Sequence, residues 1–163
     1  MASEAWRAVA DAVDPDVDLR VPRELGAHPV AVLGSISAGG VAGALARYGL
    51  SEVFPRDPGG WPWATWAVNV AGCLLIGVLM VLISEVWTGR RLLRPFLGIG
   101  VLGGFTTFST AMVEVQQLVA EGAARLGLLY LVGTVAAAMM AVIIGSGVTR
   151  WALFAVERLG RRS

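Results

Sequence analysis

The sequence predicts an all-α membrane protein with four transmembrane helices, because its charges are few and unevenly spaced. Of 163 residues, 56% are hydrophobic and 15% are charged, against roughly 45–50% and about 25% in soluble domains. Uncharged runs of 22, 27, 19 and 24 residues lie between Glu24 and Arg47, Asp57 and Glu85, Arg94 and Glu114, and Arg125 and Arg150. Each run is close to the ~20 residues that a helix needs to cross the hydrocarbon core. A soluble enzyme with a single core is therefore excluded.

The chain divides into an extension, a membrane domain and a tail. Residues 1–28 contain six acids and three arginines and predict an acidic soluble extension. A four-helix domain is expected over residues 29–150, followed by a basic cytoplasmic tail over 151–163. The four spans are predicted at 29–50, 62–84, 95–119 and 124–149. Pro62 and Pro95 suit the first turns of their helices, where the missing N–H would have no helical partner.

Arginine placement predicts the orientation of the chain. Four spans put the N-terminus, the loop between the second and third spans, and the C-terminus on one side. That side holds ten arginines and the other side three. The excess of positive charge marks the cytoplasmic side, so both termini are expected in the cytoplasm. A net charge of +1 without a basic stripe also argues against nucleic-acid binding.

The third span contains a segment that is a poor helix interior. Residues 103–110 read Gly-Gly-Phe-Thr-Thr-Phe-Ser-Thr, and paired glycines followed by β-branched threonines disfavour a helix. Non-helical backbone at membrane depth is tolerated only where protein or a wet cavity surrounds it. Such a break exposes carbonyls to a cation and N–H groups to an anion. The simpler alternative is a kink whose hydroxyls bond back to the preceding turn.

Other polar residues within the spans favour an anion as the ligand. Asn69 lies in the middle of the second span, and its amide must face protein or a pore. Tyr130 and Thr134 share one face of the fourth span. Hydroxyls, an amide and aromatic ring edges suit a small anion better than a metal ion, which prefers carboxylate, histidine or thiolate clusters. Each polar residue alone is also explained as a contact between helices.

The chain resembles the bacterial fluoride channel family known as Fluc or CrcB over roughly residues 30–150. Three motifs in the family's order carry the resemblance: Gly39-Gly40-x-x-Gly43-Ala44-x-x-Arg47-Tyr48, Thr65-x-x-Val68-Asn69-x-x-Gly72, and Gly103-Gly104-Phe105-Thr106-Thr107-Phe108-Ser109-Thr110 followed by Glu114. The resemblance implies a dual-topology, antiparallel dimer in the bacterial plasma membrane. It also implies passive export of cytoplasmic fluoride to relieve its toxicity, and no enzymatic activity.

The resemblance also implies roles for particular residues. Gly103 and Thr106 would offer backbone carbonyls to a structural Na⁺ that is not transported. Arg47 and Glu114 would lie at the vestibule. The fluoride pore would be lined by Phe108, Asn69, Tyr130, Thr134, Thr107 and Ser109.

The sequence departs from the family at two pore positions. Ala111 stands where a second phenylalanine is usual, and Ala138 lacks the oxygen expected on the fourth helix. With the arginine bias, the missing ring favours a heterodimer with an oppositely oriented paralogue. The alternative is a homodimer in which Met112 or another side chain replaces the ring.

Two other functions compete with the channel. A small proton-coupled multidrug exporter also has four spans, but it needs a carboxylate in the first span, which has none. A non-transporting scaffold would use the glycines for packing alone, leaving the threonine-rich break and Asn69 unexplained.

Overall fold

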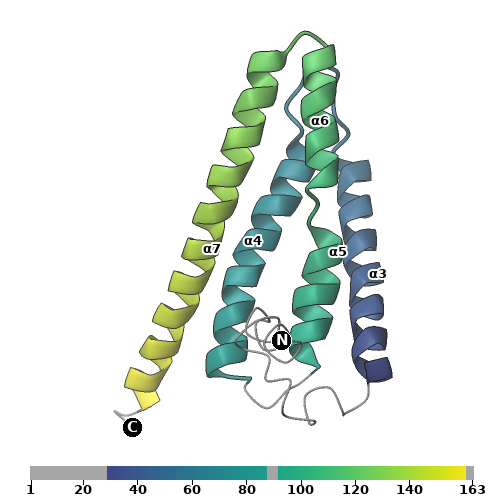
Figure 1. The fold of residues 1–163 in the computed structure, drawn as a ribbon. Coiled ribbons are helices and arrows are strands. Elements are labelled where there is room, and N and C mark those ends of the chain that lie inside the picture. Colours follow the sequence, from purple (N-terminus) through teal and green to yellow (C-terminus); the bar gives the residue numbers. More distant parts are fainter. Residues whose placement is uncertain (1–28, 88–91, 161–163) are drawn as a thin grey trace, which may run out of the picture.

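The structure, a computed structural model, describes residues 29–87 and 92–160 and is helical with short connections. Within these residues, four helical segments are long and apolar enough to cross a membrane: Val30–Val53, Trp63–Glu85, Arg94–Ala120 and Ala124–Arg158. They form an elongated bundle (Figure 1). The predicted extension over 1–28 lies outside the described residues. The four-span membrane fold predicted from the charge spacing is confirmed.

The first helix, α3 (Pro29–Val53), packs along the lower half of the third span. That half consists of η1 (Arg94–Leu102), which is wound as a wide π-type helix, and the short α5 (Gly103–Phe105). The backbones nearly touch, because a Cβ added at Gly39 would overlap the Phe96 carbonyl and one at Gly43 would overlap the Val101 carbonyl. These two glycines permit the close contact that small residues give membrane helices.

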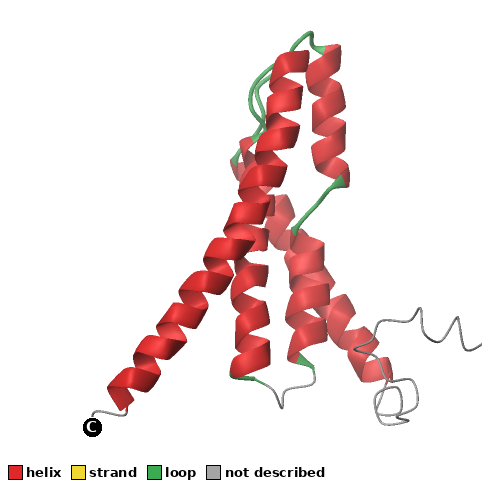
Figure 2. Ribbon diagram, turned by 60° about the vertical axis from the view of Figure 1, so that its left-hand side comes forward, coloured by secondary structure: helices red, strands yellow, loops and turns green. Residues whose placement is uncertain are grey.

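The predicted break interrupts the third span in the middle of the bundle. Helix α5 ends at Phe105, and Thr106 has an extended backbone with φ −79° and ψ 156°. Helix α6 (Ser109–Ala120) then resumes the span. Figure 2 shows the extended connection between the two halves. The Gly-Gly-Phe-Thr-Thr sequence therefore gives a true break and not a simple kink, although the Thr106 hydroxyl does donate back to the Leu102 carbonyl at 3.0 Å.

The second span, α4 (Trp63–Glu85), packs against the long α7 (Ala124–Gly160), which also contacts α6. Helix α7 passes the predicted span end at residue 149 and continues through most of the predicted tail. No proline or glycine interrupts residues 148–159, so nothing in the sequence stops the helix there. Helix α3 starts at Pro29, while α4 and α7 finish at Glu85 and Gly160. These three helix termini lie at the same end of the bundle (Figure 1).

Charged and turn residues close the opposite end of the bundle. Arg56, in the connection between α3 and α4, pairs with Glu121 at the end of α6. The Gly59 N–H donates to the second Glu121 oxygen at 2.7 Å. Gly59 and Gly122 have φ of +69° and +81°, values that residues with a Cβ rarely adopt. One carboxylate thus joins two connections that are distant in sequence.

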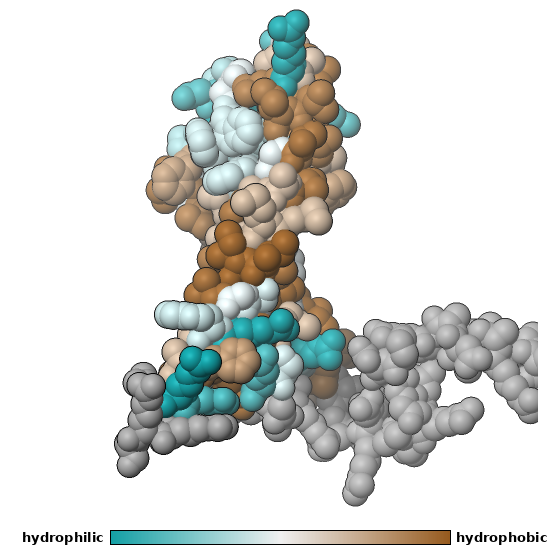
Figure 3. Space-filling model, turned by 90° about the vertical axis from the view of Figure 1, so that its left-hand side faces the viewer, coloured by the Kyte–Doolittle hydropathy of each residue, from teal (hydrophilic) through white to brown (hydrophobic). Residues whose placement is uncertain are grey.

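The face of the bundle seen in Figure 3 is apolar along the middle and hydrophilic toward its ends. Large hydrophobic side chains such as Leu128, Met139 and Ile143 are more than half exposed. The bundle's own core is small and includes Val68, Leu118 and Tyr130. In a soluble protein this surface would be an aggregation hazard, whereas lipid or a neighbouring subunit accepts it.

Candidate functional site

The Asn69 side chain holds the break in place. Its Nδ2 donates to the Thr107 carbonyl at 2.8 Å, and its Oδ1 accepts from the Thr107 N–H at 2.8 Å. Both are backbone groups that lose their helical partners at the break. The amide predicted to face protein or a pore therefore has a protein partner, and it also borders a cavity described below.

The break leaves carbonyl oxygens without a hydrogen bond. In a continuous helix the Thr107 N–H would donate to Gly103, but here it donates to Asn69. The Thr110 N–H donates to the Thr107 hydroxyl, leaving the Thr106 carbonyl without that donor. No donor from the described residues reaches the Gly103 or Thr106 oxygen. Free backbone carbonyls are ligands that suit a hard monovalent cation.

One face of α4 supplies the contacts to the upper half of the third span. Thr65, Asn69 and Gly72 follow one another by four and three residues and so share this face. The Thr65 hydroxyl donates to Glu114 at 2.6 Å. At Gly72 an added Cβ would overlap the Thr106 methyl group. This face therefore sets the position of both α6 and the break.

Glu114 is held between two hydroxyl donors. The Tyr130 hydroxyl, from α7, donates to Glu114 Oε2 at 2.7 Å, while Thr65 occupies Oε1. Tyr130 is fully buried, and the Trp61 ring packs edge-on against it with centroids 5.4 Å apart. Two hydroxyls and one carboxylate, from Thr65, Tyr130 and Glu114, thus connect α4, α7 and α6 by hydrogen bonds.

A small cavity of about 40 Å³ with a positive charge lies on one side of Thr107. Arg47, at its edge, is half-buried, and its Nε donates to the Gly104 carbonyl at 3.2 Å. The other polar side chains of the lining are all hydroxyls: Ser51, Thr65, Thr107 and Thr110. Arginine and hydroxyl donors are groups that bind an anion.

A second cavity of about 50 Å³ also borders Thr107. Its wall is mostly apolar and includes the Phe108 ring, while its polar residues are Asn69, Thr107, Tyr130 and Thr134. The Thr134 hydroxyl donates to the Tyr130 carbonyl of its own helix at 2.6 Å. Thr107, within the break, borders both cavities.

The structure brings most of the predicted site residues to the lining of these two cavities. Phe108 is 74% exposed and projects from the protomer, and Ser109 is also exposed. Ala111 is buried against Tyr130, and Met112 lines the second cavity. Sequence reasoning gave no role to Thr65 or Trp61. Thr65 could have been found from its spacing with Asn69, whereas the Trp61 contact depends on a loop conformation.

The fold and site define a class of integral membrane protein in which two small cavities border the break in a transmembrane helix. Drug-sized ligands occupy pockets of roughly 300–1,000 Å³, so cavities of this size suit a small ion. The arginine and hydroxyls that line the first cavity favour an anion.

Comparison with known proteins assigns the family. The family model described as "CrcB-like protein, Camphor Resistance (CrcB)" matches residues 35–146. "Fluoride-specific ion channel FluC 2" of Nocardia farcinica is 55% identical over 128 residues, covering 78% of this chain and 91% of the relative. Two proteins of Streptomyces avermitilis also match: FluC 2 is 48% identical over 74% of this chain and 78% of its own length, and FluC 3 is 40% identical over 80% and 64%. The chain belongs to the CrcB-like family.

Proposed function

We propose that this chain is a subunit of a passive, fluoride-selective channel. The observation that carries the proposal is the pair of small cavities that share Thr107, one lined by Arg47 and hydroxyls and the other by an amide, hydroxyls and an aromatic ring. The relatives are named as fluoride-specific ion channels, which supports the same ion. An ion crossing the protomer would pass Thr107 between the two cavities.

The chemistry of the two cavities suits fluoride in particular. Fluoride is small and strongly hydrated, so a pore must replace its water with closely spaced donors. Arg47 would attract the anion, and the Phe108 ring would present its positive edge. Hydrogen fluoride enters cells uncharged and ionises in a near-neutral cytoplasm, so a passive pathway lets the trapped anion leave down its electrochemical gradient.

We infer a structural Na⁺ at the break from the free carbonyls and the family resemblance. Gly103 and Thr106 would hold it through backbone oxygens, together with the same residues of a second subunit. When bound, the ion supplies fixed positive charge in a region of low dielectric, where its attraction for an anion is strong. The chain's contribution is the Asn69 contact, which directs the Thr107 N–H away from the Gly103 oxygen.

The second subunit is proposed to dock antiparallel on the exposed break. Phe108 and Gly103 are exposed in the protomer, and a partner there would cover both. The end of the bundle that holds Pro29, Glu85 and Gly160 would face the cytoplasm, because the arginine-rich segments adjoin it in sequence. Without a partner, the aromatic ring assigned to the pore would face lipid.

The partner is either a paralogue or a second copy of this chain, and the missing ring at Ala111 distinguishes the two arrangements. Numbered FluC proteins within Streptomyces avermitilis show that related chains coexist in one species. Met112, which borders the same cavity as Phe108, is the residue positioned to replace the ring in a homodimer.

Purified chain reconstituted alone into vesicles tests these arrangements. If a paralogue completes the pore, this chain alone gives fluoride efflux at the background rate, and adding the paralogue restores it. Rapid efflux from the chain alone would establish a homodimer, and Met112→Ala should then slow it.

Replacing Phe108 by isoleucine is expected to abolish fluoride efflux, because the substitution keeps an apolar side chain and removes the ring edge. The measurement is efflux followed with a fluoride electrode, using vesicles that contain the chain with whichever partner gives activity. Phe154→Ile is the matched control, since Phe154 is 64% exposed on α7 beyond the site. Unchanged efflux in Phe108→Ile would contradict the proposed pore and favour a scaffold.

A further inference from the structure

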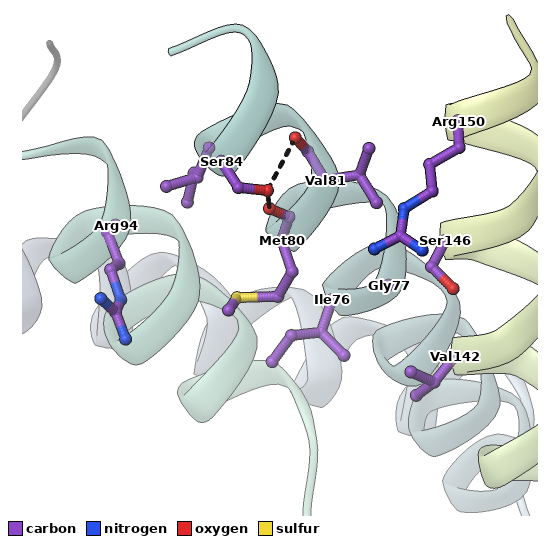
Figure 4. A pocket seen from close by; sticks show the side chains of 10 residues that line it. Ile76, Gly77, Met80, Val81, Ser84, Arg94, Val142, Ser146 and Arg150 are labelled. Carbon is purple, nitrogen blue, oxygen red and sulfur yellow. Dashed lines mark hydrogen bonds between the residues drawn. The ribbon is translucent and has the colours of Figure 1, made fainter. Parts of the chain in front are cut away.

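A larger cavity lies away from the break, between α4, η1 and α7, at the end of the bundle where the arginine-rich segments adjoin the helices. Its volume is about 480 Å³. Figure 4 shows Arg94 on one side, Arg150 on the other, and Ile76 and Met80 between them. The proposed fluoride pathway uses none of these residues.

The cavity exists because two helices that touch at one level separate below it. A Cβ at Gly77 of α4 would overlap the Val142 carbonyl of α7, and one at Gly145 would overlap the Leu74 carbonyl. Beyond this crossing α7 diverges from the rest of the bundle (Figures 1 and 2). The space opens between the diverging helices.

The lining changes from apolar to polar along the two helices. Ile76 and Val142 lie at the deep end, and Ser84 and Arg150 lie eight residues further along α4 and α7. Eight helical residues span about 12 Å, so the gradient runs from the hydrocarbon depth toward the interface. Trp87 and Trp151 lie just beyond the polar end in sequence, as interfacial aromatic residues do. The cavity is thus amphipathic in the same direction as a lipid.

The charge at the polar end is positive. Arg94 and Arg150 contribute two positive charges, and Glu85 opposes them with one, 3.5 Å from the Arg150 Nε. Both side chains of that ion pair are largely exposed, at 62% and 42%, so the pair is weak and water competes for it. Arg94 has no carboxylate partner among the described residues. A phosphate between the two arginines would gain more than the exposed pair loses.

We propose that this cavity binds one anionic phospholipid, with an acyl chain along Ile76, Met80 and Val142 and the headgroup phosphate between Arg94 and Arg150. Basic pockets between helices on the cytoplasmic side are typical sites for anionic headgroups. The apolar inner part of the cavity favours a lipid, because a free phosphate has no acyl chain to bury there.

The test measures lipid preference on the assembled protein. Delipidated protein is titrated with phosphatidylglycerol or phosphatidylcholine, and bound lipids are counted by native mass spectrometry. We expect the wild type to retain one phosphatidylglycerol per chain, and Arg94→Gln/Arg150→Gln to bind it about tenfold more weakly, with phosphatidylcholine binding unchanged. Arg94→Lys/Arg150→Lys keeps both charges and should keep most of the preference for phosphatidylglycerol. This variant also shows whether substitutions at these two positions still allow the protein to fold.

Arg125→Gln is the matched control, because Arg125 is an exposed arginine at the opposite end of the bundle. An equal loss in this variant would overturn the proposal by showing a general charge effect. If inorganic phosphate at equal concentration displaces phosphatidylglycerol, the ligand of the cavity is a free anion and not a lipid, which would overturn the proposal. Loss of the dimer on cross-linking in Arg94→Gln/Arg150→Gln would assign the cavity to a subunit contact. None of these results depends on fluoride flux, so the lipid site and the proposed channel function are tested independently.

Discussion

Asn69→Leu is expected to unfold the break and abolish fluoride efflux. Leucine has nearly the same size but leaves the Thr107 N–H and carbonyl without their 2.8 Å partners. An unpaired group costs about 1–3 kcal/mol when it is fully buried, and these two are partly buried, so the loss is expected to be at most about 2–6 kcal/mol against a typical stability of about 5–15 kcal/mol. Thermal unfolding in detergent measures this loss independently of flux.

Thr134→Val is the matched control for Asn69→Leu. It removes a hydroxyl on the same cavity, but that hydroxyl donates only to the Tyr130 carbonyl of its own helix. The control should unfold within a few degrees of the wild type. If Asn69→Leu unfolds at the wild-type temperature, the amide does not hold the break.

Gly39→Ala is expected to destabilise the bundle by about 1–3 kcal/mol, whereas Gly40→Ala leaves it nearly unchanged. The two glycines are adjacent, but a Cβ at Gly39 would overlap the Phe96 carbonyl, and one at Gly40 meets nothing within 4 Å. Forcing an extra methyl group into a tight contact shifts the backbone and typically costs this much. Here α3 would have to separate from η1.

The measurement is the unfolding temperature of the two variants in the same detergent. At Gly40, alanine should slightly favour the helix, since glycine costs roughly 0.5–1 kcal/mol in a helix interior. Equal losses at both positions would show that the contact between α3 and η1 does not limit stability.

Local patterns in the sequence were sufficient to predict the four helices and the break. The length of an uncharged run determines whether a helix can cross the membrane. The Gly103-Gly104 pair followed by two threonines disfavours a helix wherever such a sequence occurs. The end of α7 was predicted too early, because hydropathy reports membrane depth and not helix length. The π-type winding of η1, which lies against Gly39 and Gly43 of α3, was not predicted from the sequence.

The site was predicted as a set of residues but not as a network. Asn69 was recognised as a costly amide, yet its partner lies 38 residues away and becomes identifiable only once α4 and the third span are in register. The same holds for the Thr65–Glu114 contact and for Arg47 with the Gly104 carbonyl. Sequence identifies which polar groups need partners, and tertiary packing decides which partners they receive.

The double contact between Asn69 and Thr107 has a consequence for assembly. One side chain within the same protomer satisfies both Thr107 backbone groups, so this part of the break is held without an ion or a second subunit. A partner of the kind proposed above would then meet a surface that is already ordered, and the entropy lost on association would be smaller. The same contact spares a lone subunit two of the unpaired backbone groups that are costly within a membrane.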